Sequence, residues 1–260
     1  EYTLADVGEH TYTVKETSTD GNGITVDGKT YTVTVTVSDN GDGTLEITAS
    51  DNATALDFVN TYGATVSVTF EGTKTLEGRE LTEADVFAFE VKEGDKVVAT
   101  GTSDATGKIT YSKINYTLAD VGEHTYVITE SSTDGKGITV DDKTYTVKVT
   151  VTDDGKGSLQ VEVSGDDHTA LNFTNKYEAK GNVTFAGTKT LEGRELTAED
   201  VFTFEIAETG TDKTWTAKND ETGKIGYPTI EYTLADVGEH TYTVKETSTA
   251  GNGITVDGNT

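Results

Sequence analysis

The sequence predicts an all-β protein made of tandem immunoglobulin-like β-sandwich domains. Sequence blocks recur at a domain-sized interval, and short runs of alternating apolar and polar residues are separated by turn residues. Thr, Val, Tyr and Phe, which strands prefer, are enriched in these runs. Many short strands at regular spacing are typical of a β-sandwich.

The repeat has a period of about 115 residues. A decapeptide that ends in VGEH begins at Glu1, Asn115 and Glu231. Two further blocks, GTKTLEGREL and F-x-N-x-Y, each occur twice at the same spacing. A period of this length indicates an array of similar domains and excludes a solenoid of small units.

The positions of these blocks predict one complete repeat between two incomplete ones. The complete repeat spans residues 63–178, which is long enough to bury a core without metals or disulfides. Residues 1–62 correspond to the C-terminal part of a repeat, and residues 179–260 to the N-terminal part. The connections between repeats are short, which favours a semi-rigid rod.

Each strand of the complete repeat is predicted from alternation with a period of two, and turn residues mark its ends. The predicted strands are 64–70, 86–91, 108–112, 123–130, 144–151, 158–163 and 170–177. The strongest helical signal is a single turn at residues 81–85, for which Thr82 is the expected cap.

Composition excludes several classes of function. The chain has 46 acidic and 20 basic residues, a formal net charge of −26, so we expect no nucleic acid partner and no anionic membrane partner. It has no Cys, which excludes disulfides and thiolate chemistry. No apolar run is long enough to span a bilayer, so we expect no membrane insertion.

No sequence motif indicates a cofactor or a metal ion. There is no phosphate-binding loop and no nucleophile elbow. His10, His124 and His240 occupy equivalent positions in the three repeats, and no second ligand accompanies them, so we interpret them as structural or solvent-facing. We therefore expect neither a cofactor nor a metal site.

Strand parity directs three polar residues of the complete repeat into its core. Lys74 keeps the parity of the apolar residues before it, while Glu130 and Asn175 continue the apolar faces of their own strands. Gly72 could disrupt the parity of Lys74 through a bulge. The incomplete repeats hold four equivalent residues: Glu16, Asn60, Lys189 and Glu246.

Burying a Lys, a Glu and an Asn is costly unless they pair with one another. On residue types alone, a buried salt bridge with an amide neighbour explains this set, because structural ion pairs are the commoner use of such groups.

Three motifs occur in a fixed order along the chain: G-T-K-x-L-x-G-R-x-L, H-T-Y-x-x-x-E and F-x-N-x-Y. In this order they resemble the pilin isopeptide-linkage domain of Gram-positive surface proteins, which is related to CnaB-type folds. The resemblance covers residues 64–177 and the matching parts of both incomplete repeats. It implies an isopeptide bond between Lys74 and Asn175, with Glu130 as the assisting acid. It further implies that Glu16 and Glu246 are equivalent acids, and that Lys189 and Asn60 are cross-linking residues unpaired within their own repeats.

The residue types suit the reaction that the resemblance implies. Desolvation lowers the pKa of a Lys and raises that of a Glu, so a neutral amine can face a protonated acid. The amine attacks the Asn side-chain carbon, Glu130 polarises the carbonyl and moves a proton, and ammonia leaves. Each domain reacts once, so we expect autocatalytic cross-linking and no enzyme.

The resemblance implies a stalk or pilus-shaft segment on the cell wall of a Gram-positive bacterium, whose partners are neighbouring copies of the repeat or pilin subunits. Two alternatives stay open. The incomplete repeats of neighbouring molecules could complete one domain, which would make the chain an assembly module. Loops at the sandwich ends could instead bind a host protein or glycan, although none is unusually long or aromatic.

Overall fold

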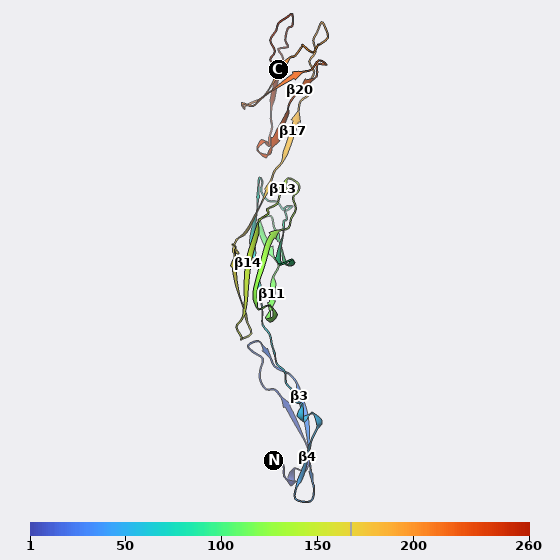
Figure 1. The fold of residues 1–260 in the computed structure, drawn as a ribbon, viewed down its shortest axis with the longest axis vertical. Coiled ribbons are helices and arrows are strands. Elements are labelled where there is room, and N and C mark those ends of the chain that lie inside the picture. The colour runs from blue at the N-terminus through green and yellow to red at the C-terminus, as the bar shows by residue number, and fades with distance from the viewer. Residues whose placement is uncertain (167) are drawn as a thin grey trace. The chain divides into compact units, whose positions relative to one another are not determined.

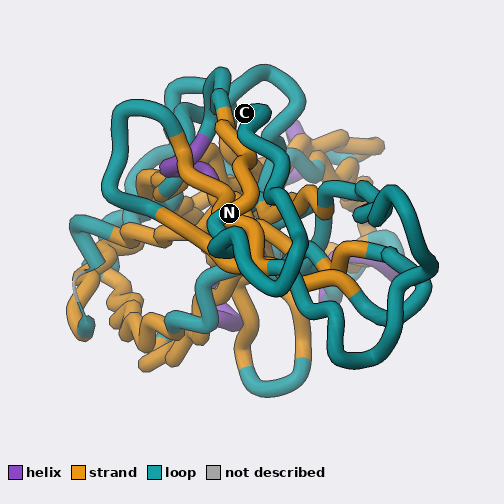
Figure 2. Tube along the Cα trace, turned by 90° about the horizontal axis from the view of Figure 1, so that it is seen from above, coloured by secondary structure: helices purple, strands orange, loops and turns teal. Residues whose placement is uncertain are grey.

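The computed structural model describes residues 1–166 and 168–260 and confirms the all-β class. Strands and loops form nearly all of these residues, and the helical pieces among them are four short 3-10 turns (Figure 2). The chain divides into two compact units. The first comprises Glu1–Thr75, Leu81–Thr133 and Val140–Asn175, and the second comprises Leu76–Glu80, Asp134–Thr139 and Lys176–Thr260.

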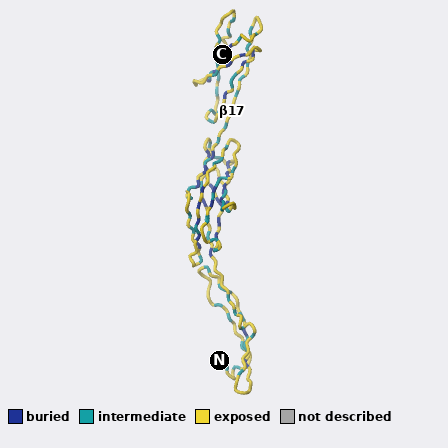
Figure 3. Tube along the Cα trace, in the orientation of Figure 1, coloured by how far each residue is buried: buried dark blue, intermediate teal, exposed yellow. Residues whose placement is uncertain are grey.

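The N-terminal part of the first unit is a small antiparallel sheet with little core. Its strands are β1 (Gly8–Lys15), β3 (Thr30–Asp39) and β4 (Leu45–Ala49), in the order β1-β3-β4. β2 (Ile24–Thr25) pairs with β5 (Thr61–Tyr62), and two 3-10 turns lie at η1 (Leu4–Asp6) and η2 (Asp51–Thr54). Most of these residues are exposed (Figure 3), as expected for strands that cover little apolar surface.

A larger sheet of nine strands extends in sequence from β7 to β16 and includes β14, which is labelled in Figure 1. Its members are β7 (Glu71–Glu77), β8 (Ala88–Glu93), β9 (Lys96–Ser103), β10 (Lys108–Tyr111), β12 (Gly122–Glu130), β13 (Ile138–Thr139), β14 (Thr144–Asp153), β15 (Leu159–Gly165) and β16 (Leu171–Tyr177). Their order is β13-β16-β7-β10-β9-β8-β12-β14-β15. β16, the last long strand in sequence, is therefore the neighbour of β7, the first.

Two further strands pack against this sheet and complete a β-sandwich. β6 (Thr65–Val68) pairs with β11 (Ile114–Thr117), and β15 also contacts β6, so the sheet curls around one core. The turn η3 (Leu118–Asp120) follows β11. The fully buried side chains are mainly aromatic and β-branched, and they include Phe89, Tyr126, Ile128, Val147 and Phe173.

The second unit repeats part of this arrangement. β17 (Lys180–Thr184) pairs with β21 (Thr229–Thr233), and η4 (Leu234–Asp236) follows. The other strands are β18 (Thr203–Glu208), β19 (Thr214–Asn219), β20 (Ile225–Gly226) and β22 (Tyr242–Glu246), in the order β20-β19-β18-β22. Its core is smaller and is centred on Phe202, Phe204 and Ile206.

Several elements differ from the sequence-based expectation. The strand expected at 64–70 is shorter: β6 ends at Val68, and β7 begins only at Glu71. Gly72 produces no bulge, because it pairs in regular register with Ile109 of β10. A side chain at residue 72 would lie 2.4 Å from the carbonyl oxygen of Leu171, so glycine permits the close approach of β16. Residues 81–85 form a turn in place of a helical turn, and the Asp85 carboxylate accepts hydrogen bonds from both the backbone N–H and the hydroxyl of Thr82.

Replacing Phe173 by Ala should lower the free energy of unfolding by about 3–5 kcal/mol, because its buried ring packs on Phe89 and Tyr145. Urea denaturation followed by circular dichroism measures this loss. The equivalent Phe58 is only half-buried, so Phe58→Ala is the matched control and should cost clearly less. Equal losses in the two variants would contradict the assignment of the core.

Candidate cross-linking site

Three strands bring Lys74, Glu130 and Asn175 together in the core of the first unit. Lys74 lies in β7 and Asn175 in the neighbouring β16, while Glu130 is the last residue of β12 and pairs with Phe89 of β8. The side chains of Lys74 and Glu130 are 0% exposed, and Asn175 is equally buried. All three point to the face that strand alternation predicts for them.

Glu130 bridges the two nitrogen atoms of the site. Its Oε2 lies 2.6 Å from the Lys74 amine Nζ, and its Oε1 accepts a hydrogen bond from the Asn175 amide Nδ2 at 2.8 Å. The Lys74 Nζ also contacts the Asn175 carbonyl oxygen Oδ1. One carboxylate thus touches both the nucleophile and the leaving group of an amide exchange.

The carbonyl oxygen of Asn175 has a second donor that the sequence did not predict. The backbone N–H of Asp141 donates to Oδ1 at 2.7 Å. The two Glu130 oxygens contact nitrogen atoms, whereas the Asp141 N–H and the Lys74 amine contact the carbonyl oxygen of Asn175.

Burial lowers the pKa of Lys74, and the hydrogen bond and charge of Glu130 oppose this shift without cancelling it. The aromatic ring of Phe87 lies 5.1 Å from the amine and helps to exclude water. A lowered pKa makes the neutral, nucleophilic amine easier to reach at ordinary pH.

A tight turn fixes the backbone of Lys74. Its N–H donates to the carbonyl of Gly107 at 2.6 Å, and a side chain at residue 107 would lie 2.2 Å from the Lys74 carbonyl oxygen. Gly107 has a φ of 83°, which glycine adopts readily. Gly223 makes the same contacts with Lys189, so the turn belongs to the repeat. The T-G-K sequence at this turn is a signal that could have identified it.

The N-terminal repeat assembles the Glu–Asn half of the site. The Asn60 amide donates to Glu16 at 2.9 Å, and the backbone N–H of Asp27 donates to the Asn60 carbonyl oxygen at 2.8 Å. These are the contacts that Asn175 makes with Glu130 and Asp141, here in an exposed setting.

The second unit assembles the Lys–Glu half. Lys189 Nζ lies 2.7 Å from Glu246 Oε2, and their side chains are 11% and 3% exposed. Glu246 Oε1 is buried and has no hydrogen-bond partner among the described residues. A cavity of about 260 Å³ beside the pair is lined in part by Lys189, Glu246 and Asp257.

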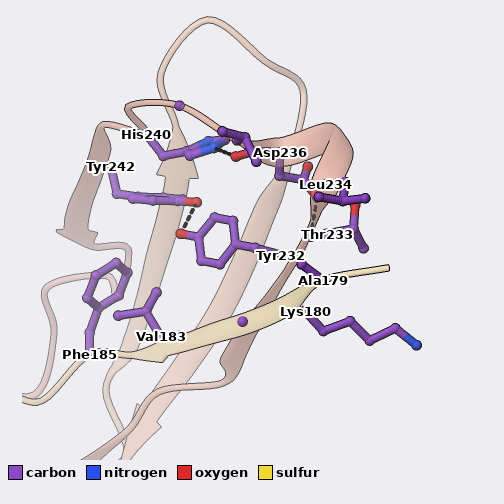
Figure 4. Close-up of a pocket in the computed structure, with 13 residues that line it drawn as sticks. Ala179, Lys180, Val183, Phe185, Tyr232, Thr233, Leu234, Asp236, His240 and Tyr242 are labelled. Carbon is purple, nitrogen blue, oxygen red and sulfur yellow. Dashed lines mark hydrogen bonds between the residues drawn. The ribbon is translucent and has the colours of Figure 1, made fainter. Parts of the chain in front are cut away.

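A larger hollow in the second unit, of about 550 Å³, opens beside β17 (Figure 4). Tyr232 and Tyr242 join their hydroxyls at 2.7 Å on one side of it, and the His240 ring bonds to the Asp236 carbonyl at 2.6 Å. In the first unit the strand equivalent to β17 is β6, which β15 contacts. The hollow is therefore the interior face of an incomplete sandwich.

The three equivalent histidines each bond to a backbone carbonyl, and His124 and His240 also contact a glutamate. His124 faces two acceptors, the Asp120 carbonyl at 2.8 Å from Nε2 and the Glu93 carboxylate at 2.7 Å from Nδ1. A neutral imidazole can donate only one hydrogen bond, so two acceptors favour the charged ring. In the described part of the chain, no group of three or more His, Cys, Asp or Glu side chains is placed to hold a metal ion.

Comparison with protein families shows that the chain belongs to the family of Spy0128-like isopeptide containing domains, FctA. The family model matches residues 1–63, 70–178 and 185–260. A search of curated proteins found no relative.

Solved structures of low similarity include two major pilins of Streptococcus pyogenes. The T-13 pilin is 14% identical, with a TM-score of 0.31, over 72% of this chain and 84% of that one. A second major pilin is 15% identical, with a TM-score of 0.28, over 72% and 83%.

Protonation of His124 should be measurable and should depend on Glu93. Burial alone would lower the pKa of His124, but the hydrogen bonds to Asp120 and Glu93 together raise it above its usual value of about 6.5. A group with a raised folded pKa stabilises fully below the unfolded pKa, and this contribution is lost as the pH rises through the folded pKa.

An NMR titration of the His124 ring should therefore give a pKa above that of an unfolded peptide, and Glu93→Gln should lower it. A midpoint at or below the peptide value, unchanged by Glu93→Gln, would contradict a charged His124 ring held by Asp120 and Glu93.

Proposed function

We propose that this chain is a structural segment of a pilus shaft or surface stalk of a Gram-positive bacterium, and that its complete repeat cross-links itself through an isopeptide bond between Lys74 and Asn175. The observation that carries the proposal is the buried contact of these residues with Glu130 between their nitrogen atoms. Membership of an isopeptide-containing family supports it.

The geometry suggests how atoms and protons balance. A proton moves from the Lys74 ammonium to Glu130, which leaves a neutral amine. The amine nitrogen bonds to the Asn175 side-chain carbon as the carbonyl electrons move to Oδ1. The amine gives up one proton, the amide nitrogen takes one through Glu130, and the carbon–nitrogen bond breaks to release ammonia. As the carbon–nitrogen bond breaks, the electrons on Oδ1 re-form the carbonyl. The Lys74 nitrogen has then lost two protons: one leaves in the ammonia, and the other stays on Glu130 until the ammonia takes it away as ammonium. Glu130 is then a carboxylate again, and the domain reacts once without turnover.

The proposed bond suits a protein that carries load. Lys74 and Asn175 are 101 positions apart, so a cross-link between them would close most of the repeat into one loop. In the chain-entropy model, closing a loop of about 100 residues stabilises by about 4–5 kcal/mol. Tension entering near Lys74 and leaving near Asn175 would bypass the residues between, and an amide cannot be reduced as a disulfide can.

The family setting favours the outer surface of the cell wall as the location and other pilin subunits as partners. No helix in residues 1–166 or 168–260 is long and apolar enough to cross a membrane. The acidic chain repels its neighbours at a distance, so end-to-end contacts would need specific attraction or a covalent link.

The intact mass of the denatured protein tests the proposed bond. We expect a mass lower by one ammonia than the sequence requires, because one amide exchange releases one ammonia. Lys74→Ala and Asn175→Ala should each restore the full mass, and Asn60→Ala should keep the loss. A wild-type protein of full mass would favour the buried salt bridge.

A second candidate function is assembly by completion of the C-terminal repeat. The buried Glu246 Oε1 without a partner and the adjoining cavity favour it, because Asn175 Nδ2 bonds to the equivalent oxygen of Glu130. A strand carrying Asn60 from a second copy has the matching sequence. Against this, residues 231–260 nearly repeat residues 1–30, so the joined domain would carry about thirty surplus residues.

If this second function holds, a denaturing gel should show a ladder of covalent multimers that Lys189→Ala and Asn60→Ala remove and Lys74→Ala does not. A single band at the monomer position, at high protein concentration, would contradict assembly and leave the shaft function intact.

A further inference from the structure

Asp141 lies in the segment before β14 and contacts both Asn175 and Thr174 of β16. We propose that the backbone N–H of Asp141 stabilises the oxyanion that forms on Asn175 Oδ1, and that the Asp141 carboxylate holds this N–H in position. The inference rests on the proposed reaction between Lys74 and Asn175.

The Asp141 N–H fixes the orientation of the reacting amide. It lies 2.7 Å from Oδ1, and because a backbone N–H can only donate, the oxygen must face it. The amide nitrogen is then turned to Glu130 Oε1, 2.8 Å away. The flipped amide would place two donors against each other and would leave Glu130 Oε1 facing an oxygen.

The side chain of the same residue ties this donor to the strand that carries the acceptor. Asp141 Oδ2 accepts from the backbone N–H of Thr174 at 2.6 Å, and Oδ1 accepts from that of Lys143 at 2.9 Å. Thr174 immediately precedes Asn175 in β16. One carboxylate therefore sets the position of both the donor N–H and the Asn175 carbonyl that it meets.

The N-terminal repeat contains the same arrangement in an exposed setting. The N–H of Asp27 donates to Asn60 Oδ1 at 2.8 Å, and its carboxylate accepts from the N–H groups of Val59 at 2.8 Å and Lys29 at 2.9 Å. Each contact matches one made by Asp141. The arrangement therefore forms without a buried core around it.

The second unit has an equivalent Asp turn at Asp257, but there the backbone N–H contacts a glutamate in place of an Asn. The Asp257 carboxylate accepts from the N–H of Asn259 at 3.0 Å, as in the other two repeats. Its own N–H donates to Glu246 Oε2 at 3.3 Å. The donor is therefore present in all three repeats, and it meets an Asn carbonyl in the two where Asn60 and Asn175 are available.

Such a donor matters most during the reaction. As Lys74 Nζ bonds to the carbon, negative charge develops on Oδ1, and a fixed N–H in a dry core stabilises that charge without reorganising. Removing one donor of this kind typically slows acyl transfer by about 10²–10³-fold. Glu130, occupied with both nitrogen atoms, is not placed to serve the oxygen.

The test follows ammonia loss over time by intact mass in protein made by cell-free synthesis, where the reaction starts on folding. Asp141→Ala should slow the loss about ten- to a hundredfold, because the N–H remains but is no longer held. Asp141→Asn, which keeps one acceptor oxygen, should react at an intermediate rate. Asp27→Ala removes the same contacts around Asn60 and should leave the rate unchanged.

Circular dichroism on each variant separates slow chemistry from failure to fold. If Asp141→Ala does not fold, Asp141→Asn decides, and a wild-type rate in that variant would overturn the inference. A folded Asp141→Ala that reacts at the wild-type rate would overturn it and leave the proposed bond standing. A wild-type chain that loses no ammonia would instead overturn the proposed function itself.

Discussion

The removal of the Lys74 ammonium from water is the constraint on which the site depends. A buried charge is strongly unfavourable unless a partner lies beside it, and a buried ion pair is itself a weak source of stability. Glu130 supplies the partner at 2.6 Å, in surroundings that are 0% exposed. An amide bond to Asn175 would replace this costly pair with a neutral group, so the energetics of the core favour the chemistry we propose.

The three repeats act as a natural comparison of the parts of the site. The Glu–Asn contact forms where Lys is missing, at Glu16 and Asn60, and the Lys–Glu pair forms where Asn is missing, at Lys189 and Glu246. Each half keeps its geometry without the other. The strands therefore preorganise the site, and the reacting groups are not needed to assemble it.

The sequence was sufficient to predict the fold class and that Lys74, Glu130 and Asn175 face the core, because alternation with a period of two determines which face a side chain takes. That Lys74 and Asn175 meet was implied by the family resemblance. It could not predict the contacts of Asp141, each of which joins a backbone N–H to a side-chain oxygen more than thirty positions away. β9 escaped prediction because Val97, Val98 and Ala99 are three consecutive apolar residues, at the point where its pairing with β8 shifts register. The T-G-K sequence marks the turn at Gly107, but the close approach of Gly107 to Lys74 becomes visible only in the folded structure.

The most direct test of the central claim is peptide mapping by tandem mass spectrometry. A protease digest of the denatured protein should contain one branched peptide in which the Lys74 side chain is joined to that of Asn175, with one ammonia missing. Separate linear peptides that carry an unmodified Lys74 and an unmodified Asn175, with no branched species, would contradict the account.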